Sequence, residues 1–200
     1  MTSEPAARWT RLGADERMQQ ILDSAVRLFT ERAYADVSTT EVAEASGVTR
    51  GLVYHYFGTK HDLYLEVLRK ITFVPPMETL SVRAWSREER IAAAVDLFME
   101  TVERIGPSWA LVTMSGGMTS DPEVRRVLDE ADDLAAERVL HLVGFEGSEK
   151  QREVAMAGVR AFGGMAKALV REMHERQSLD LEQVRALLIR NLTATLDASS

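Results

Sequence analysis

The residues best suited to chemistry lie in one acid-free stretch, residues 45–61, with the sequence ASGVTRGLVYHYFGTKH. It contains Arg50 and Lys60, two of the four histidines of the chain and two of its four tyrosines. Arginine can read guanine or bind phosphate, and side-chain hydroxyl groups mostly bind phosphates. Because the chain around this stretch is acidic, the stretch is the part of the sequence best suited to contact DNA.

Local signals predict the elements that would position this stretch. Ser38 is suited to cap a helix over residues 39–46, and Glu41 three residues later completes a capping box. Gly47 suits the left-handed turn that ends a helix, and Thr49 can cap a second short helix that runs to about Phe57. Two short helices joined by a glycine turn predict a helix-turn-helix.

In such a motif, the first residues of the second helix meet the base edges of the major groove. The apolar spacing predicts that Val48, Val53 and Phe57 face the core. An alternative for Tyr54 and Tyr56 is that both are half-buried packing residues. In the DNA-binding interpretation, the residues left outward are Thr49, Arg50, Tyr54 and His55.

Composition limits the kind of DNA contact and excludes some chemistry. The chain has 200 residues, 46% of them hydrophobic, and a formal net charge of −7. A non-specific nucleic-acid binder is usually basic overall, so DNA contact is expected only at a local patch. The absence of cysteine excludes disulfides, thiolate zinc sites and cysteine nucleophiles.

The remaining pattern predicts an all-α protein. Helical spacing or caps appear over residues 14–32, 60–73, 87–105, 122–143, 149–176 and 181–196, and no strand pattern appears. With a segment that starts at Pro107 and stops at Gly116-Gly117, about nine helices are expected. We predict a flexible arm over residues 1–13, a helix-turn-helix DNA-binding domain over residues 14–70 and an effector-binding and dimerisation domain over residues 71–200.

Hydropathy predicts no membrane partner. No apolar run approaches the ~20 residues that span a bilayer, and the first residues lack the apolar core of a signal peptide. We therefore expect a soluble, cytoplasmic protein.

The segment AYADVSTTEVAEASGVTRGLVYHYFGTKHDLYLEVL resembles the DNA-binding region of the tetracycline-repressor (TetR) family. The resemblance covers about residues 15–68 and rests on many spaced positions that agree together. Three positions depart from the family pattern, namely Ala33 for glycine, Val42 for isoleucine and Ser46 for alanine, and none of them removes a DNA-facing group.

The resemblance implies a dimeric repressor that a small ligand releases from a palindromic operator in double-stranded DNA. It also implies which residues contact the DNA. These are Thr39, Thr40, Thr49, Arg50, Gly51, Tyr54, His55 and Tyr56, with Lys60 holding a phosphate at the start of the next helix.

The last two helices carry broad apolar stripes, which in most proteins are simply core. In TetR-like proteins these two helices pair with their copies as a four-helix bundle. The resemblance therefore implies a homodimer, with an interface that includes Gly158, Ala161, Leu169, Leu181, Val184, Leu188 and Leu192.

Aromatic and methionine side chains concentrate in the middle helices. An ordinary core is one explanation, and an adaptable apolar cavity is the other. The resemblance places the effector pocket in this region. Because charge is scarce among these residues, we expect a largely apolar effector. The candidate pocket residues are Trp85, Phe98, Met99, Trp109, Met114, Met118, Phe162 and Met165.

Two other classes of function are weighed against a regulator. An all-helical enzyme would need a constellation such as paired Glu-x-x-His motifs, and no histidine has a glutamate three residues before it. A DNA-binding architectural protein without an effector would have the same helix-turn-helix. We predict a regulator without catalytic residues, metal or cofactor, and activation stays open beside repression.

Overall fold

The computed structural model describes residues 13–73, 85–106 and 120–199, and these residues form helices and no strand. The predicted all-α fold is therefore confirmed. An N-terminal group of helices, the head, comprises α1 (Ala14–Glu31), the 3-10 turn η1 (Tyr34–Asp36), α2 (Thr39–Ala45), α3 (Arg50–Phe57) and α4 (Lys60–Ile71). The larger body comprises α5 (Arg87–Ile105), α7 (Pro122–Leu142), α8 (Glu149–His174) and α9 (Leu181–Asp197).

The predicted capping box begins α2, and similar boxes begin four other helices. At α2, the backbone N–H of Ser38 donates to Oε2 of Glu41 at 2.8 Å, and the backbone N–H of Glu41 donates to Oγ of Ser38 at 3.1 Å. Such reciprocal bonds satisfy N–H groups that the helix itself leaves unpaired. The same device begins α4, α5, α8 and α9, with the pairs Thr59–Asp62, Ser86–Glu89, Ser148–Gln151 and Asp180–Gln183.

Some sequence predictions fall on residues outside the described ranges. These are residues 1–12 of the predicted arm, the segment from Pro107 to Gly116-Gly117, and the pocket residues Trp109, Met114 and Met118.

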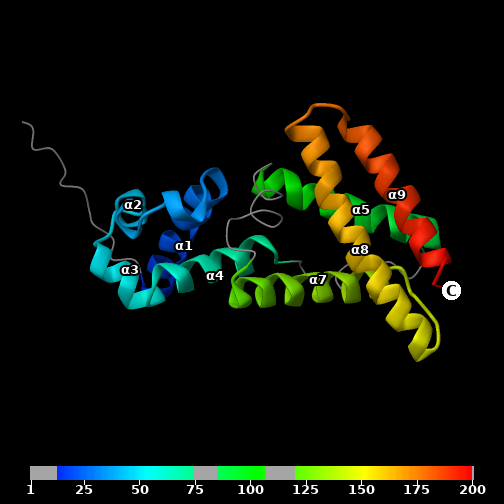
Figure 1. The fold of residues 1–200 in the computed structure, drawn as a ribbon, viewed down its shortest axis with the longest axis horizontal. Coiled ribbons are helices and arrows are strands. Elements are labelled where there is room, and N and C mark those ends of the chain that lie inside the picture. The colour runs from blue at the N-terminus through cyan, green and yellow to red at the C-terminus, as the bar shows by residue number, and fades with distance from the viewer. Residues whose placement is uncertain (1–12, 74–84, 107–119, 200) are drawn as a thin grey trace, which may run out of the picture.

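The molecule is elongated, with the head at one end and the body at the other (Figure 1). Helices α4 and α7 meet in the middle and join the two parts. In the body, α8 and α9 run side by side in opposite directions, and α9 also packs against α5.

The hydrophobic core of the head continues into the body. Leu68 of α4 is fully buried, and it belongs to one cluster with residues of the head. That cluster also contains buried valines from three body helices, namely Val102 of α5, Val124 and Val127 of α7, and Val170 of α8. Because burial of apolar surface is the main stabilising term in folding, these shared contacts fix the head on the body.

No helix of the described residues is long and apolar enough to span a bilayer.

Candidate nucleic-acid interface and ligand cavity

The turn between α2 and α3 sets the angle of the second helix. Gly47 has φ +63°, in the left-handed region that glycine occupies without strain. The next backbone N–H, that of Val48, donates to the carbonyl of Ala43 at 2.9 Å, and Oγ of Ser46 donates to the carbonyl of Val42. These bonds close the turn and leave α3 free to project from the head.

Helix α3 has the two faces that the sequence predicts. Val53 and Phe57 are buried against the head core, with 2% and 8% of their surfaces exposed, and Val48 packs beside them. The residues exposed on the opposite side are Thr49, Arg50, Gly51, Tyr54 and His55. The residues of α3 that were predicted to face outward are therefore all exposed on one side of the helix.

Arg50 is held in place on the exposed face by Tyr54. Its Nη2 atom donates to Oη of Tyr54 at 3.0 Å, and its guanidinium carbon lies 5.3 Å from the centroid of the tyrosine ring. Hydrogen bonds from Thr39 and from Arg50 lower the pKa of Tyr54. An oriented guanidinium loses less side-chain entropy when it meets a base edge or a phosphate.

The DNA contact of Thr39 stays a prediction, although its side chain is largely buried in the structure. Thr39 is only 6% exposed, because its side chain lies under Tyr54 with the two hydroxyl oxygens 3.2 Å apart. It therefore positions the phenol of Tyr54. Its neighbour Thr40 is exposed, and its contact with DNA stays a prediction.

The two tyrosines of α3 differ in their surroundings. Tyr54 is 39% exposed, whereas Tyr56 is half-buried and packs against the head core. The ring of Tyr56 also meets the edge of the His55 ring, with centroids 5.4 Å apart. The packing alternative thus describes Tyr56 better than Tyr54.

Lys60 lies at the start of α4, beside the ring of Tyr34. Its Nζ atom is 4.2 Å from the ring centroid, a cation–π distance. In the same turn, the Asp62 carboxylate accepts from the backbone N–H of Thr59 at 3.0 Å. A carboxylate already caps this helix end, so a phosphate held here would rely on the ammonium of Lys60.

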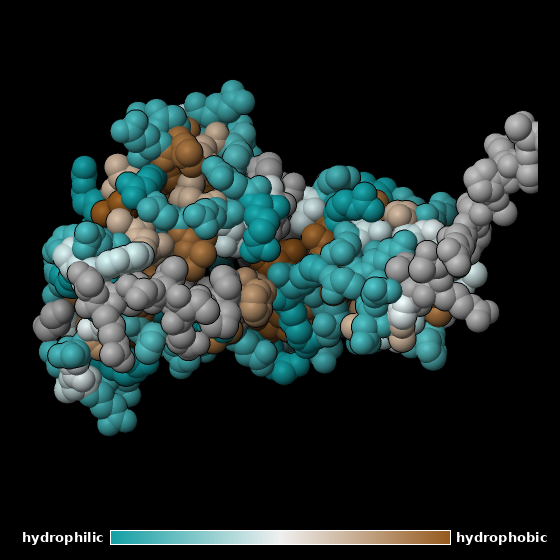
Figure 2. Space-filling view, turned by 180° about the vertical axis from the view of Figure 1, so that it is seen from behind, coloured by the Kyte–Doolittle hydropathy of each residue, from teal (hydrophilic) through white to brown (hydrophobic). Residues whose placement is uncertain are grey.

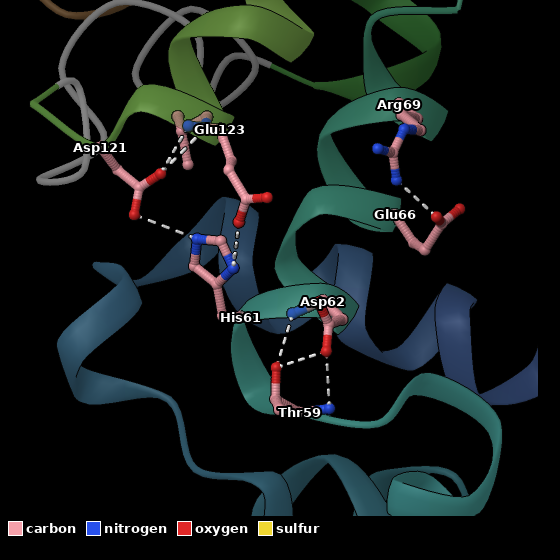
Figure 3. Close-up of polar contacts among 8 residues, drawn as sticks. Thr59, His61, Asp62, Glu66, Arg69, Asp121 and Glu123 are labelled. Atoms are coloured by element: carbon pink, nitrogen blue, oxygen red, sulfur yellow. Dashed lines mark hydrogen bonds and ion pairs between the residues drawn. The ribbon is translucent and has the colours of Figure 1, made fainter.

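The next residue of α4, His61, joins the head to the body. Its Nε2 atom lies 3.1 Å from Oδ2 of Asp121, the N-cap of α7, and its Nδ1 atom lies 3.5 Å from Oε2 of Glu123 (Figure 3). Hydrogen bonds from the backbone N–H groups of Val124 and Glu123, together with His61, lower the pKa of Asp121. The imidazole thus lies between two carboxylates of the body.

His61, Asp121 and Glu123 are also the one group of three metal-ligand side chains found among the described residues, with ligand atoms within 4.8 Å of one another. The two carboxylates face different nitrogens of the ring (Figure 3). In the structure the imidazole contacts one carboxylate through each of its two nitrogens.

A cavity of about 130 Å³ lies in the body, beside the end of α4. Figure 2 shows hydrophobic residues at the surface in the middle of one face, where the head meets the body. The cavity wall is mostly apolar and includes Ile71 at the end of α4 and the next two residues, Thr72 and Phe73. Its other walls come from α5, α7, α8 and α9.

Only some of the predicted pocket residues line the cavity in the structure. Phe98 and Phe162 line the cavity. Met99 is 6% exposed in the body core and Met165 packs against that core, and neither lines the cavity. Trp85 is 38% exposed just before α5 and also lies outside it. For these three residues the pocket prediction is wrong, because hydrophobicity does not distinguish core from cavity wall.

The sequence interpretation missed the charged residues of the cavity wall. Lys167 of α8 lies there, with Nζ 2.8 Å from Oδ1 of Asp132 on α7. Arg160 also lines the cavity and pairs with Asp133 at 2.8 Å. A signal was present for Lys167, because it is the one charged residue in the apolar run from Ala161 to Val170.

The structure corrects the predicted dimer interface. Val184, Leu188 and Leu192 are at most 1% exposed inside the body of a single protomer, so they have no surface to offer a partner. Gly158 faces α9 of the same chain, where an added Cβ would lie 2.7 Å from Cγ2 of Thr195.

The other predicted interface residues differ in exposure. Ala161 and Leu181 are exposed, and Leu169 is half-buried against the body core. An interface role for these three residues stays a prediction.

The geometry defines a helix-turn-helix DNA-binding protein with a helical body. Residues 21–67 match the family model described as bacterial regulatory proteins of the tetR family. The head of this chain therefore matches the DNA-binding domain of TetR-family transcriptional regulators, as the resemblance implied.

Known relatives support this assignment. The HTH-type transcriptional activator FasR of Mycolicibacterium smegmatis is 26% identical over 154 residues, which are 76% of this chain and 70% of FasR. A TetR-family regulator from Streptomyces coelicolor has a similar fold, with a TM-score of 0.74 at 23% identity, covering 94% of this chain and 83% of that one. The regulator FadR from Bacillus subtilis, solved in complex with stearoyl-CoA, has a TM-score of 0.61 at 18% identity, covering 89% and 97%.

Proposed function

We propose that this chain is a homodimeric transcriptional repressor that binds a palindromic operator and is released by a small, largely apolar effector. It acts in the cytoplasm and catalyses no reaction. The observation that carries this proposal is the path of α4. One end of this helix follows the recognition helix α3, and residues at the other end line the apolar cavity. A ligand in the cavity therefore touches the helix that supports the DNA-binding surface.

The wall of the cavity supports an apolar effector. Aromatic and aliphatic side chains such as Phe73, Phe98, Val139 and Phe162 make up most of it. Apolar walls with a few placed polar groups are typical of small-molecule sites. FadR from Bacillus subtilis, which has a similar fold, was solved with an acyl-CoA.

An exposed stripe on α8 supports a dimer through this helix. Its members recur every three or four residues and are small or apolar, so a second helix can approach closely. A two-fold dimer would present two copies of α3 to successive half-sites of a palindrome. The stripe consists of Val154, Ala157, Ala161, Gly164 and Ala168.

Activation is the second candidate mode of regulation. The relative FasR, which matches 76% of this chain, is named a transcriptional activator. The same DNA-binding surface serves either mode, and the position of the operator relative to the promoter decides between them.

The test measures DNA binding first and then the release of DNA by small molecules. Genomic fragments bound by the purified protein are sequenced, and the bound operator is then titrated with compounds of graded polarity. We expect a palindromic operator, a dimer by sedimentation and release by apolar compounds. A protein that sediments as a monomer at micromolar concentration would contradict the proposal. Release by highly polar compounds alone would also contradict it. DNA binding that no small molecule alters would favour an architectural protein.

A further inference from the structure

We propose that the effector is an amphiphilic anion, whose apolar part fills the cavity and whose single anionic group binds Lys167 in place of Asp132. This inference rests on the proposed function, because it names the chemical class of ligand for the same cavity. It is drawn from one feature, a nearly buried ammonium group on an otherwise apolar wall.

Lys167 is deeply placed for a lysine. Its side chain is 13% exposed, and the apolar residues Phe162 and Ala166 line the cavity beside it. Lysine is rarely buried without a partner, because the unpaired charge loses its hydration. In the structure, both carboxylate oxygens of Asp132 supply that partner, at 2.8 and 3.2 Å from Nζ.

The two members of this ion pair differ in their access to water. The side chain of Asp132 is 39% exposed, three times the fraction of Lys167. The carboxylate of Asp132 can keep its contact with water when it leaves the pair, whereas Lys167 lies mostly within the cavity wall. An incoming anion can therefore replace the carboxylate and keep Lys167 neutralised.

The sign of the effector charge follows from this asymmetry. A cationic ligand would have to displace Lys167 itself and leave its ammonium unpaired in an apolar wall, which is unfavourable. A neutral ligand would leave the Lys167–Asp132 pair intact and gain nothing from it. An anion gains a charge-assisted hydrogen bond, among the strongest single polar contacts available.

A second ion pair lies at the edge of the same cavity. Arg160 is one of the lining residues, and its Nη1 atom lies 2.8 Å from Oδ1 of Asp133. Both members of this pair are more exposed than Lys167, at 42% and 56%. Arg160 therefore lies at the solvent side, and Lys167 is the cation that a ligand inside the cavity meets.

Replacement of Asp132 by a ligand anion at Lys167 would also affect the packing of the body helices. The Lys167–Asp132 pair connects α8 to α7, and the N-cap of α7 is Asp121, the partner of His61 in the head. An anion that takes Lys167 from Asp132 removes one of the contacts that fix α7. Anion binding is in this way coupled to the helix that holds the head.

The test compares two probes of equal chain length, octanoate and octan-1-ol, by calorimetric titration of the full chain. We expect octanoate to bind the parent at least about tenfold more tightly, the value of one charge-assisted hydrogen bond. Lys167→Gln should bind both probes equally. Asp132→Asn should bind octanoate more tightly than the parent, because the competing carboxylate is gone.

The Asp132→Asn result separates a ligand site from a structural ion pair, since a purely structural role predicts weaker binding. Lys150→Gln, at the exposed start of α8 and away from the cavity wall, is the matched control and should keep the preference for octanoate. Should Asp132→Asn fail to fold, Lys167→Gln decides the question, because a lost anion contact weakens the binding of octanoate alone and a damaged cavity weakens the binding of both probes.

Three outcomes would overturn this inference. They are equal binding of the two probes by the parent, a preference that survives in Lys167→Gln, and weaker octanoate binding by folded Asp132→Asn. Equal, tight binding of both probes would leave the proposed apolar cavity intact. Octanoate bound at Lys167 without any effect on operator affinity would keep the inference and contradict the proposed release of DNA. Binding of neither probe would overturn both.

Discussion

The Nε2 atom of His61 lies 3.1 Å from Oδ2 of Asp121, which ties the first turn of α4 to the first turn of α7 (Figure 3). If this contact transmits the effect of ligand binding to the head, His61→Ala should reduce the ratio of the operator affinity without effector to the operator affinity with effector. Operator binding alone and effector binding alone should change little. Allostery is a coupling free energy between two sites, so the ratio is the quantity to measure.

Glu66→Gln is the matched control for His61→Ala. Glu66 lies on the same helix and pairs with Arg69 of that helix at 2.6 Å, with no contact to the body in that pair (Figure 3). The control should keep the parent ratio. An unchanged ratio in His61→Ala would show that the tie does not carry the coupling.

Arg50 and Tyr54 should act as a unit in DNA recognition. Arg50→Ala is expected to cost about 1–3 kcal/mol of operator binding and to relax specificity at one base pair. Tyr54→Phe removes the hydroxyl that accepts from Arg50, so it should cost less and lose its effect when Arg50 is already alanine. Fluorescence anisotropy with the operator and single-base variants measures both.

Lys60→Ala is the comparison for this pair. A lost phosphate contact should weaken all DNA sequences alike and lower the slope of affinity against salt by about one. Additive losses in the Arg50–Tyr54 double variant would mean that the hydrogen bond has no role on DNA.

The capping box of α2 should make part of the stability depend on acid. Hydrogen bonds from the backbone N–H and hydroxyl of Ser38, with the guanidinium of Arg32, hold the pKa of Glu41 at about 2, against an ordinary 4.5. Because the pKa is lowered in the folded state, the ionised carboxylate contributes stability above pH 4.5, and this contribution is lost between pH 4.5 and about 2.

Glu41→Gln keeps a cap acceptor but has no charge to lose. Its free energy of unfolding should therefore lie below that of the parent at about pH 6. This gap, the difference in free energy between parent and variant, should narrow at about pH 3. Urea titrations at the two pH values measure the gap. A gap of equal size at both would contradict the assignment.

Leu188 and Leu181 test which face of α9 is core. Leu188 is fully buried, so Leu188→Ala should destabilise the protomer by about 2–5 kcal/mol. Leu181 lies on the same helix at 48% exposure, and Leu181→Ala should change the stability of the monomer by less than about 0.5 kcal/mol. Denaturation at several protein concentrations separates folding from association. Similar losses for both would contradict the core assignment.

Helix boundaries were predictable because they depend on residues close in sequence. Ser38 with Glu41 and Ser86 with Glu89 satisfy backbone groups within one turn, so spacing alone identifies them. The faces of α3 followed in the same way, since Val53 and Phe57 repeat with the helical period.

The remaining features depend on contacts between distant segments. Burial of Thr39 requires Tyr54 to fold over it, fifteen residues away. Helix α9 is apolar on more than one side, so periodicity could not say that Leu188 faces the protomer core. The contact between His61 and Asp121 joins residues that are 60 positions apart, and no local sequence pattern indicates it.

The valines that α5, α7 and α8 contribute to the core of the head have a consequence for engineering. A fragment that stops after Phe73 would lack Val102, Val124, Val127 and Val170, and would leave apolar side chains of α4 in water. Grafting this recognition module onto another regulator therefore requires transplanting the matching valines as well, so the unit of exchange in a chimaera is larger than the helix-turn-helix.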